Sequence, residues 1–187
     1  MIFFKWLSRL HAPFLVVILS LFSRADDLQG YWLTRKLDSD LPSSIIHLDI
    51  GPDGLLHGQV VAGFYEADAP IPDRVCKRCN KHSSDGRYGI SRNQEIVGSY
   101  AVWGFEQQSP GFWVAGNVVR VKNGKRYNAN LQLRKPNLLN LTVFFGIFHW
   151  TLQWERLSEA QVRAICKSDI SSVSQQTNVR SYCIGIK

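Results

Sequence analysis

The chain has 187 residues and a formal net charge of +7 at pH 7, from 22 Lys and Arg against 15 Asp and Glu. This length suffices for one domain with a substantial core. Its basic residues are scattered, with a single cluster at Arg74–Arg78, whereas nucleic-acid-binding domains gather theirs into a dense patch with stacking aromatic residues. The composition therefore argues against a nucleic-acid-binding protein.

The first 25 residues have the three parts of a secretory signal peptide. Lys5 and Arg9 give a positive start, residues 13–22 form an apolar run, and Ser23 and Ala25 are the small residues of a cleavage site. The apolar run is too short for a membrane anchor, which needs about 20 residues. We therefore expect an exported protein that does not span a membrane after cleavage. The 162 residues left lose three basic side chains, so their net charge is +4.

From residue 27 to residue 157, short runs of β-forming residues are separated by Gly, Pro, Asn and Asp. Asn123-Gly124 is the strongest hairpin signal, because both residues tolerate the positive φ of a tight turn. The pattern predicts an all-β fold: an eight-stranded, mostly antiparallel up-and-down barrel, which closes its own edges. The predicted strands are Gly30–Lys36, Ser44–Ile50, Leu55–Phe64, Glu95–Glu106, Phe112–Val121, Lys125–Leu133, Leu138–Phe145 and Ile147–Leu157.

Two further segments complete the predicted architecture. A long loop, residues 66–94, separates the third and fourth strands and needs a staple or a function to be stable. Ser158 and Gln161 have the spacing of a capping box, which predicts a short helix to about Lys167. We expect the tail beyond it to be loose until its last cysteine. The predicted organisation is a signal peptide (1–25), a β-barrel domain (26–157) and a C-terminal helix with a disulfide-tied tail (158–187).

The four cysteines all lie beyond the signal peptide, and an even number in an exported protein predicts two disulfides. Three pairings are open from sequence alone. We favour one bond within the long loop and one within the tail, because each closes a local loop. The favoured pairs are Cys76–Cys79 and Cys166–Cys183.

The long loop has two alternative interpretations. Cys76 and Cys79 have zinc-ligand spacing and His82 follows three residues later, but a closed site needs a fourth ligand. A redox role is the other alternative, because Lys77 and Arg78 would favour a thiolate. We favour the disulfide over both, and the sequence predicts no cofactor.

Side-chain alternation places Phe148, Trp150, Leu152 and Trp154 on one inward face of the last strand, with Arg156 at its end. A charge at that position is costly unless it is paired or stacked. The first strand carries a matching indole at Trp32, so we predict that Arg156 packs over Trp32 and closes one end of the barrel. The alternative is that Arg156 emerges into solvent.

A Gly-x-Trp on the first strand and an Arg on the last resemble the shared mark of the calycins, the group of lipocalins and fatty-acid-binding proteins. A more specific resemblance rests on six short segments: Gly30–Thr34, Ile46–Leu48, Gly58–Val61, Phe112–Val118, Asn123–Ala129 and Gln153–Arg156. Through them, residues 27–157 resemble the bacterial exported family known as domain of unknown function 2147. The resemblance implies a calycin-like barrel in the bacterial periplasm or the extracellular space, and it implies no activity.

The chain departs from that family in two places. Around residues 85–97 a Pro-containing stretch of the family is replaced by Asn93–Gly98. About thirty residues are also added after the family's ending. Some relatives carry a Cys-x-x-Cys in the same loop, as this chain does at Cys76.

No nucleophile is paired with a base in any known catalytic motif, so we expect a protein that is not an enzyme. The leading hypothesis is a barrel that binds a small apolar ligand in the cell envelope. The alternative is an interaction or structural protein that contacts an anionic envelope surface through its basic Cys-containing loop. A cavity in the barrel favours the first hypothesis, and a filled interior favours the second. The oligomeric state is not predicted. The predicted ligand-lining residues are Trp103, Tyr127, Phe145, Phe148 and Trp150.

Overall fold

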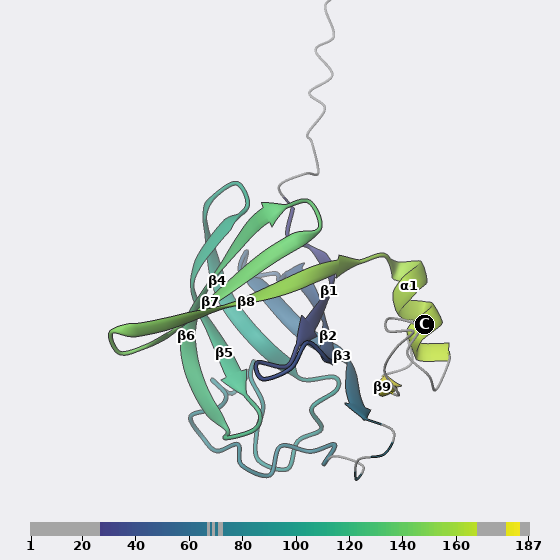
Figure 1. The fold of residues 1–187 in the computed structure, drawn as a ribbon. Helices are drawn as coiled ribbons and strands as arrows, with labels where there is room; N and C mark the ends of the chain where they lie inside the picture. The colour runs from purple at the N-terminus through teal and green to yellow at the C-terminus, as the bar shows by residue number, and fades with distance from the viewer. Residues whose placement is uncertain (1–26, 67, 69, 71–72, 168–178, 184–187) are drawn as a thin grey trace, which may run out of the picture.

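Nine strands and one helix make up the part of the chain that the computed structural model describes, namely residues 27–66, 68, 70, 73–167 and 179–183 (Figure 1). The signal peptide predicted at 1–25 lies outside these residues. The elements are β1 (Gly30–Arg35), β2 (Pro42–Ile50), β3 (Leu56–Glu66), β4 (Tyr100–Ser109), β5 (Phe112–Arg120), β6 (Lys125–Lys135), β7 (Leu138–Phe145), β8 (Phe148–Leu157), α1 (Glu159–Lys167) and β9 (Val179–Cys183).

Strands β1 to β8 form a closed antiparallel barrel. Each pairs with its neighbours in sequence, and β1 pairs with β8 to close the sheet. In the closing register Trp32 lies opposite Arg156 and Leu33 opposite Glu155. Closure gives each of these eight strands two neighbours, although β4 pairs with only the first half of β3. The predicted eight-stranded up-and-down barrel is confirmed.

The fourth strand begins at Tyr100, five residues later than predicted. Glu95 belongs to the long loop instead, where it forms an isolated bridge with Val75. Residues 96–99, just before β4, form a tight turn, since the Ser99 amide donates to the Ile96 carbonyl. Tertiary pairing within the loop therefore overrides the strand propensity of this segment.

Strand β9 was not predicted, and it lies along β3. The first half of β3 pairs with β4 through Leu56–Gln59, and its second half pairs with β9 through Ala62–Glu66. The tail thus covers the edge of β3 that β4 leaves open, which protects it from pairing with other chains. The segment predicted to be loose, residues 168–177, lies outside the described residues.

Helix α1 begins with the predicted capping box. The Ser158 hydroxyl accepts from the Gln161 amide at 3.3 Å, and the Gln161 side chain accepts from the Ser158 amide at 2.8 Å. Val162 and Ile165 are fully buried against the outer faces of β1 to β3. Figure 1 shows α1 beside β9 on this side of the barrel, where the two elements share the Cys166–Cys183 disulfide. Within the described ranges, no helix has the length and apolar character needed to cross a membrane.

Candidate functional site

One end of the barrel is closed by Arg156 and Trp32. The guanidinium carbon of Arg156 lies 4.3 Å from the centre of the Trp32 ring, in cation–π geometry. The same guanidinium donates hydrogen bonds to the carbonyl oxygens of Asp27, Gln29 and Pro136, at 2.6–2.7 Å. It therefore ties the chain before β1 to the β6–β7 turn. The predicted pairing over Trp32 forms, and the solvent-exposed alternative does not.

Gly30 makes room for this arrangement. Its φ is +117°, and a β-carbon there would lie 3.2 Å from a terminal nitrogen of Arg156. Partial burial lowers the pKa of Arg156, and the nearby carboxylate of Asp27 acts in the opposite direction. The guanidinium remains charged because arginine deprotonates only far above neutral pH. The closed end is thus a fixed structural plug with its donors satisfied by carbonyls.

The interior above this plug is filled by side chains. Large residues from every part of the barrel wall form one buried cluster, and its three tryptophans are at most 4% exposed. Eight-stranded barrels have an interior just wide enough for such filling. The deep interior therefore holds core, which counts against a ligand enclosed within the barrel and favours the surface-interaction hypothesis. A ligand site of this barrel would have to lie at its open end. The largest fully buried members are Leu28, Trp32, Leu48, Leu56, Phe105, Leu131, Leu139 and Leu141.

The other end of the barrel presents inward-facing aromatic side chains to solvent. Along the inward face of β8, Trp154 is buried, Trp150 is half-buried and Phe148 is 68% exposed. Phe148 pairs across the hairpin with Phe145, which is 59% exposed. The ring of Tyr127 on β6 makes edge-on contacts with the rings of Phe145 and Trp150. The distances between ring centres are 6.2 Å to Phe145 and 5.5 Å to Trp150. We call Tyr127, Phe145, Phe148 and Trp150 the aromatic rim.

Trp103, the fifth predicted lining residue, does not belong to this rim. It is 2% exposed on the outer surface of β4, beneath the long loop. The cause is a bulge in β4: Leu56 pairs with Phe105 but Gly58 pairs with Val102, so two residues oppose one. The extra residue reverses the side-chain alternation and turns Trp103 outward. Gly104, with a φ of +72°, marks the bulge.

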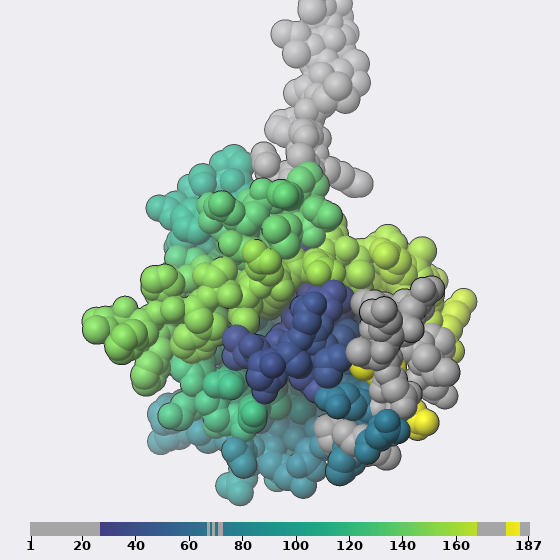
Figure 2. All heavy atoms as spheres, in the orientation of Figure 1, coloured from purple at the N-terminus to yellow at the C-terminus, as the bar shows by residue number. Residues whose placement is uncertain are grey.

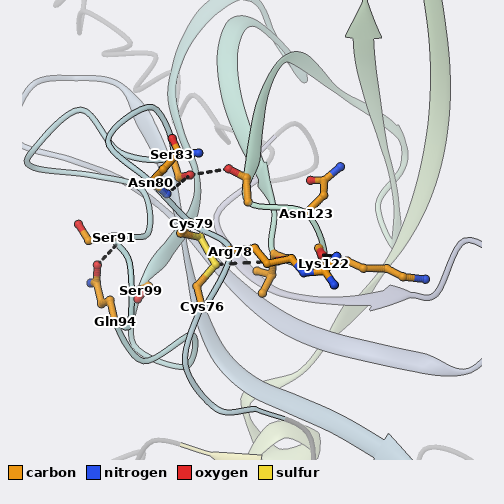
Figure 3. Close-up of a disulfide and its surroundings, with 12 residues drawn as sticks. Cys76, Arg78, Cys79, Asn80, Ser83, Ser91, Gln94, Ser99, Lys122 and Asn123 are labelled. Atoms are coloured by element: carbon orange, nitrogen blue, oxygen red, sulfur yellow. Dashed lines mark hydrogen bonds between the residues drawn. A yellow bond between two sulfur atoms is a disulfide. The ribbon is translucent and has the colours of Figure 1, made fainter.

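The long loop packs over Trp103 and carries the first disulfide. The sulfur atoms of Cys76 and Cys79 are bonded, and both residues are buried with Ile90 and Val119. Figure 3 shows this disulfide beside the β5–β6 turn, where Arg78 donates to the Lys122 carbonyl. Both favoured pairings, Cys76–Cys79 and Cys166–Cys183, are present. The disulfide occupies both thiols of the alternative zinc site with His82. Among the described residues no group of three His, Cys, Asp or Glu side chains is arranged to hold a metal ion.

The basic residues of the loop are mostly engaged within the molecule. Arg74 lies over the ring of Tyr182 at 5.5 Å, and Lys77 forms an ion pair with Asp73 at 2.7 Å. Lys81 lines an open pocket of about 430 Å³ on the loop's outer surface, together with Asn80, Ser84, Gly86, Ser91 and Arg92. The loop therefore offers fewer free cations than the sequence indicates.

A buried histidine fastens the loop to the barrel wall and was not assigned this role from sequence. His57 on β3 is 4% exposed, and its Nδ1 accepts from the amide of Gly104 at 3.3 Å. Its Nε2 therefore carries the proton and lies 3.0 Å from an Asp53 carboxylate oxygen. The Tyr88 ring of the loop stacks on the imidazole at 3.8 Å. The hydrogen bond between His57 and the Asp53 carboxylate is the main cause of the lowered pKa of Asp53.

The comparisons with known proteins agree with this fold. The family model of an uncharacterized protein conserved in bacteria, DUF2147, matches residues 30–156. A solved structure from the human pathogen Helicobacter pylori, described as belonging to the lipocalin family, superposes with a TM-score of 0.58. It is 16% identical in sequence, and the match covers 74% of this chain and 88% of that chain. No curated protein matches the sequence.

Proposed function

The chain belongs to the bacterial family DUF2147, and we propose that it binds a small apolar molecule at its aromatic rim, without catalysis. The observation that carries this proposal is the change in burial along the inward face of β8, from buried Trp154 to 68% exposed Phe148. Folded proteins rarely leave contiguous apolar surface open to water unless it binds something. The lipocalin-like fold is compatible with small-ligand binding.

The size and chemistry of the ligand follow from the surroundings of the rim. The filled core beneath it leaves no room for a deep insertion, so the ligand lies across the rim. Aromatic faces and edges favour a flat or short apolar molecule, and the Tyr127 hydroxyl and the Trp150 indole N–H are the polar groups of the rim. That hydroxyl already accepts from the side-chain amide of Asn123 at 3.1 Å and can still donate.

The proposed setting is outside the cytoplasm. Two disulfides are typical of oxidising compartments, and the family is bacterial. These observations support export, and we propose the periplasm or the extracellular space as the site of action. An oxidising setting also keeps the Cys76–Cys79 staple closed, which holds the long loop against β4 and β5.

A fluorescence titration tests the proposal. An environment-sensitive anilinonaphthalene sulfonate probe is expected to bind the wild type with one saturable site. Trp150→Leu and Tyr127→Leu each remove a ring from the rim, so about tenfold weaker binding is expected. Phe144→Leu is the matched control, because Phe144 lies on the same hairpin but on its outer face. Equal affinity in all four proteins contradicts the proposal.

A further inference from the structure

The end of the β7–β8 hairpin carries the densest exposed apolar surface of the described chain. Of the six large hydrophobic side chains that are exposed in the described ranges, four lie within five consecutive residues. Figure 2 shows this hairpin protruding from the body of the molecule. We call these residues the apolar tip: Phe144 (37% exposed), Phe145 (59%), Ile147 (90%) and Phe148 (68%).

A ligand held at the aromatic rim leaves half of this tip uncovered. Phe145 and Phe148 face inward and belong to the rim, but Ile147 lies in the turn between the strands. Phe144 alternates to the outer face, where its ring lies 6.2 Å from that of His149. A second, larger apolar partner is therefore needed to cover Ile147 and Phe144.

A long stretch of chain around the tip carries only positive charge. Residues 107–154, from the last residues of β4 to the middle of β8, contain six Lys or Arg and no Asp or Glu. Four of the six are exposed at the β5–β6 turn, and two of these four lie on β6, the strand that pairs with β7. In the described part of the chain none of them forms an ion pair with a carboxylate. These four, Arg120, Lys122, Lys125 and Arg126, are called the basic turn.

The register places the basic turn beside the apolar tip. Asn128 pairs with Phe144, and β6 begins three residues earlier at Lys125. Arg126 therefore lies beside the end of β7, and Tyr127 between them contacts Phe145. An apolar protrusion flanked by cations is the arrangement with which proteins bind anionic lipid surfaces.

We propose that the β7–β8 hairpin docks the protein on an anionic phospholipid surface, with Ile147 inserted among the lipids and the basic turn at the headgroups. A second copy of the chain is a poorer partner, because a symmetric contact would bring two basic turns together. A protein partner would need a groove shaped for a protruding tip, whereas a bilayer accepts one of any shape. The inference is independent of ligand binding, since Ile147 takes no part in the rim.

Vesicle co-sedimentation tests the docking proposal. The full chain, with both disulfides formed, is mixed with vesicles of phosphatidylcholine containing one-third phosphatidylglycerol, and with vesicles of phosphatidylcholine alone. The wild type is expected to bind the anionic vesicles more tightly, and binding is expected to weaken as salt rises. Ile147→Ser is expected to lower the partition coefficient about tenfold, and Lys125→Gln about fivefold.

Two variants serve as matched controls. Ile50→Ser removes an exposed apolar side chain from the opposite end of the barrel, and Lys135→Gln removes a cation from the β6–β7 turn at that end. Both are expected to bind as the wild type does. All proteins share the same N-terminal residues, so any contribution from that segment cancels in the comparison.

The outcomes distinguish lipid docking from ligand binding and from self-association. Loss of vesicle binding in Ile147→Ser with unchanged probe affinity supports docking, whether or not the rim binds a ligand. Equal vesicle binding by Ile147→Ser and Ile50→Ser overturns it. A second result also overturns docking: the wild type does not bind vesicles, and it forms a concentration-dependent dimer in sedimentation velocity that Ile147→Ser abolishes. The tip then serves self-association.

Discussion

The guanidinium of Arg156 stacks on the indole of Trp32 while it donates to three backbone carbonyls of the closed end. Replacing it by alanine removes the stacking and leaves these carbonyls without their donor. We expect Arg156→Ala to lower the free energy of unfolding by about 2 kcal/mol. Arg156→Lys should recover only part of this loss, because one ammonium cannot reproduce a planar, five-donor group. Urea unfolding measures both effects.

Arg134→Ala is the control for that experiment. Arg134 is exposed on β6, and its guanidinium donates only to the side chain of Gln132. Its loss should change the free energy of unfolding by no more than about 0.5 kcal/mol. An equal effect of Arg134→Ala and Arg156→Ala contradicts the structural role of the closed end.

Gly124 is the point at which the β5–β6 turn meets the long loop. Its φ is +68°, and a β-carbon there would lie 2.0 Å from the Arg78 carbonyl oxygen. Gly146 has a similar φ of +59° but no atom within 4 Å of its β-carbon position. Gly146→Ala should therefore cost only backbone strain, about 1 kcal/mol, whereas Gly124→Ala should cost more and displace the loop. Acrylamide quenching of Trp103 should rise only in Gly124→Ala.

The two disulfides should contribute unequally to stability. Cys166 and Cys183 are 17 residues apart and hold β9 beside α1, whereas Cys76 and Cys79 are three residues apart. Closing a loop of that larger size stabilises a protein by about 3 kcal/mol. Cys166→Ala/Cys183→Ala should therefore lose more stability than Cys76→Ala/Cys79→Ala. Hydrogen exchange should accelerate in β9 in the first double variant, and at Ile90 in the second.

The hydrogen bond between His57 and Asp53 should give stability that depends on pH. The folded state lowers the pKa of Asp53 below its ordinary value of 3.8, mainly through the hydrogen bond with His57. The stabilisation is thus fully present above pH 3.8 and is lost as pH falls through the lower, folded-state pKa. Wild type should melt at a higher temperature than Asp53→Asn at neutral pH. A difference in melting temperature between the wild type and Asp53→Asn that stays constant down to strongly acidic pH would contradict this pH dependence.

The barrel could be predicted from short-range sequence patterns, because its strands pair with their neighbours in sequence. Asn123-Gly124, the Ser158 capping box and the stacking of Arg156 on Trp32 each depend on a short-range or end-to-end pattern that the sequence displays. Strand β9 escaped prediction because its formation depends on the open edge of β3, which lies more than a hundred residues earlier.

The rim was only partly predictable for a different reason. Alternation correctly placed Phe145, Phe148 and Trp150 on the inward face, but it could not tell how far the buried core extends beneath them. Trp103 was misplaced because one bulged residue reverses alternation, and no sequence rule separated a Gly in a bulge from a Gly in a regular strand. Because the long loop packs over the outer face of β4 and β5, that face carries apolar side chains as the core does.

Native mass spectrometry of the protein isolated from its own producing cells tests the central claim most directly. We expect a bound small molecule of low polarity on the wild type, in a ratio of one to one. We also expect loss of that molecule in a Tyr127→Leu/Trp150→Leu variant and its retention in Phe144→Leu. A wild type that carries no small molecule, and binds none of the lipids extracted from the same cells, would contradict a ligand site at the aromatic rim.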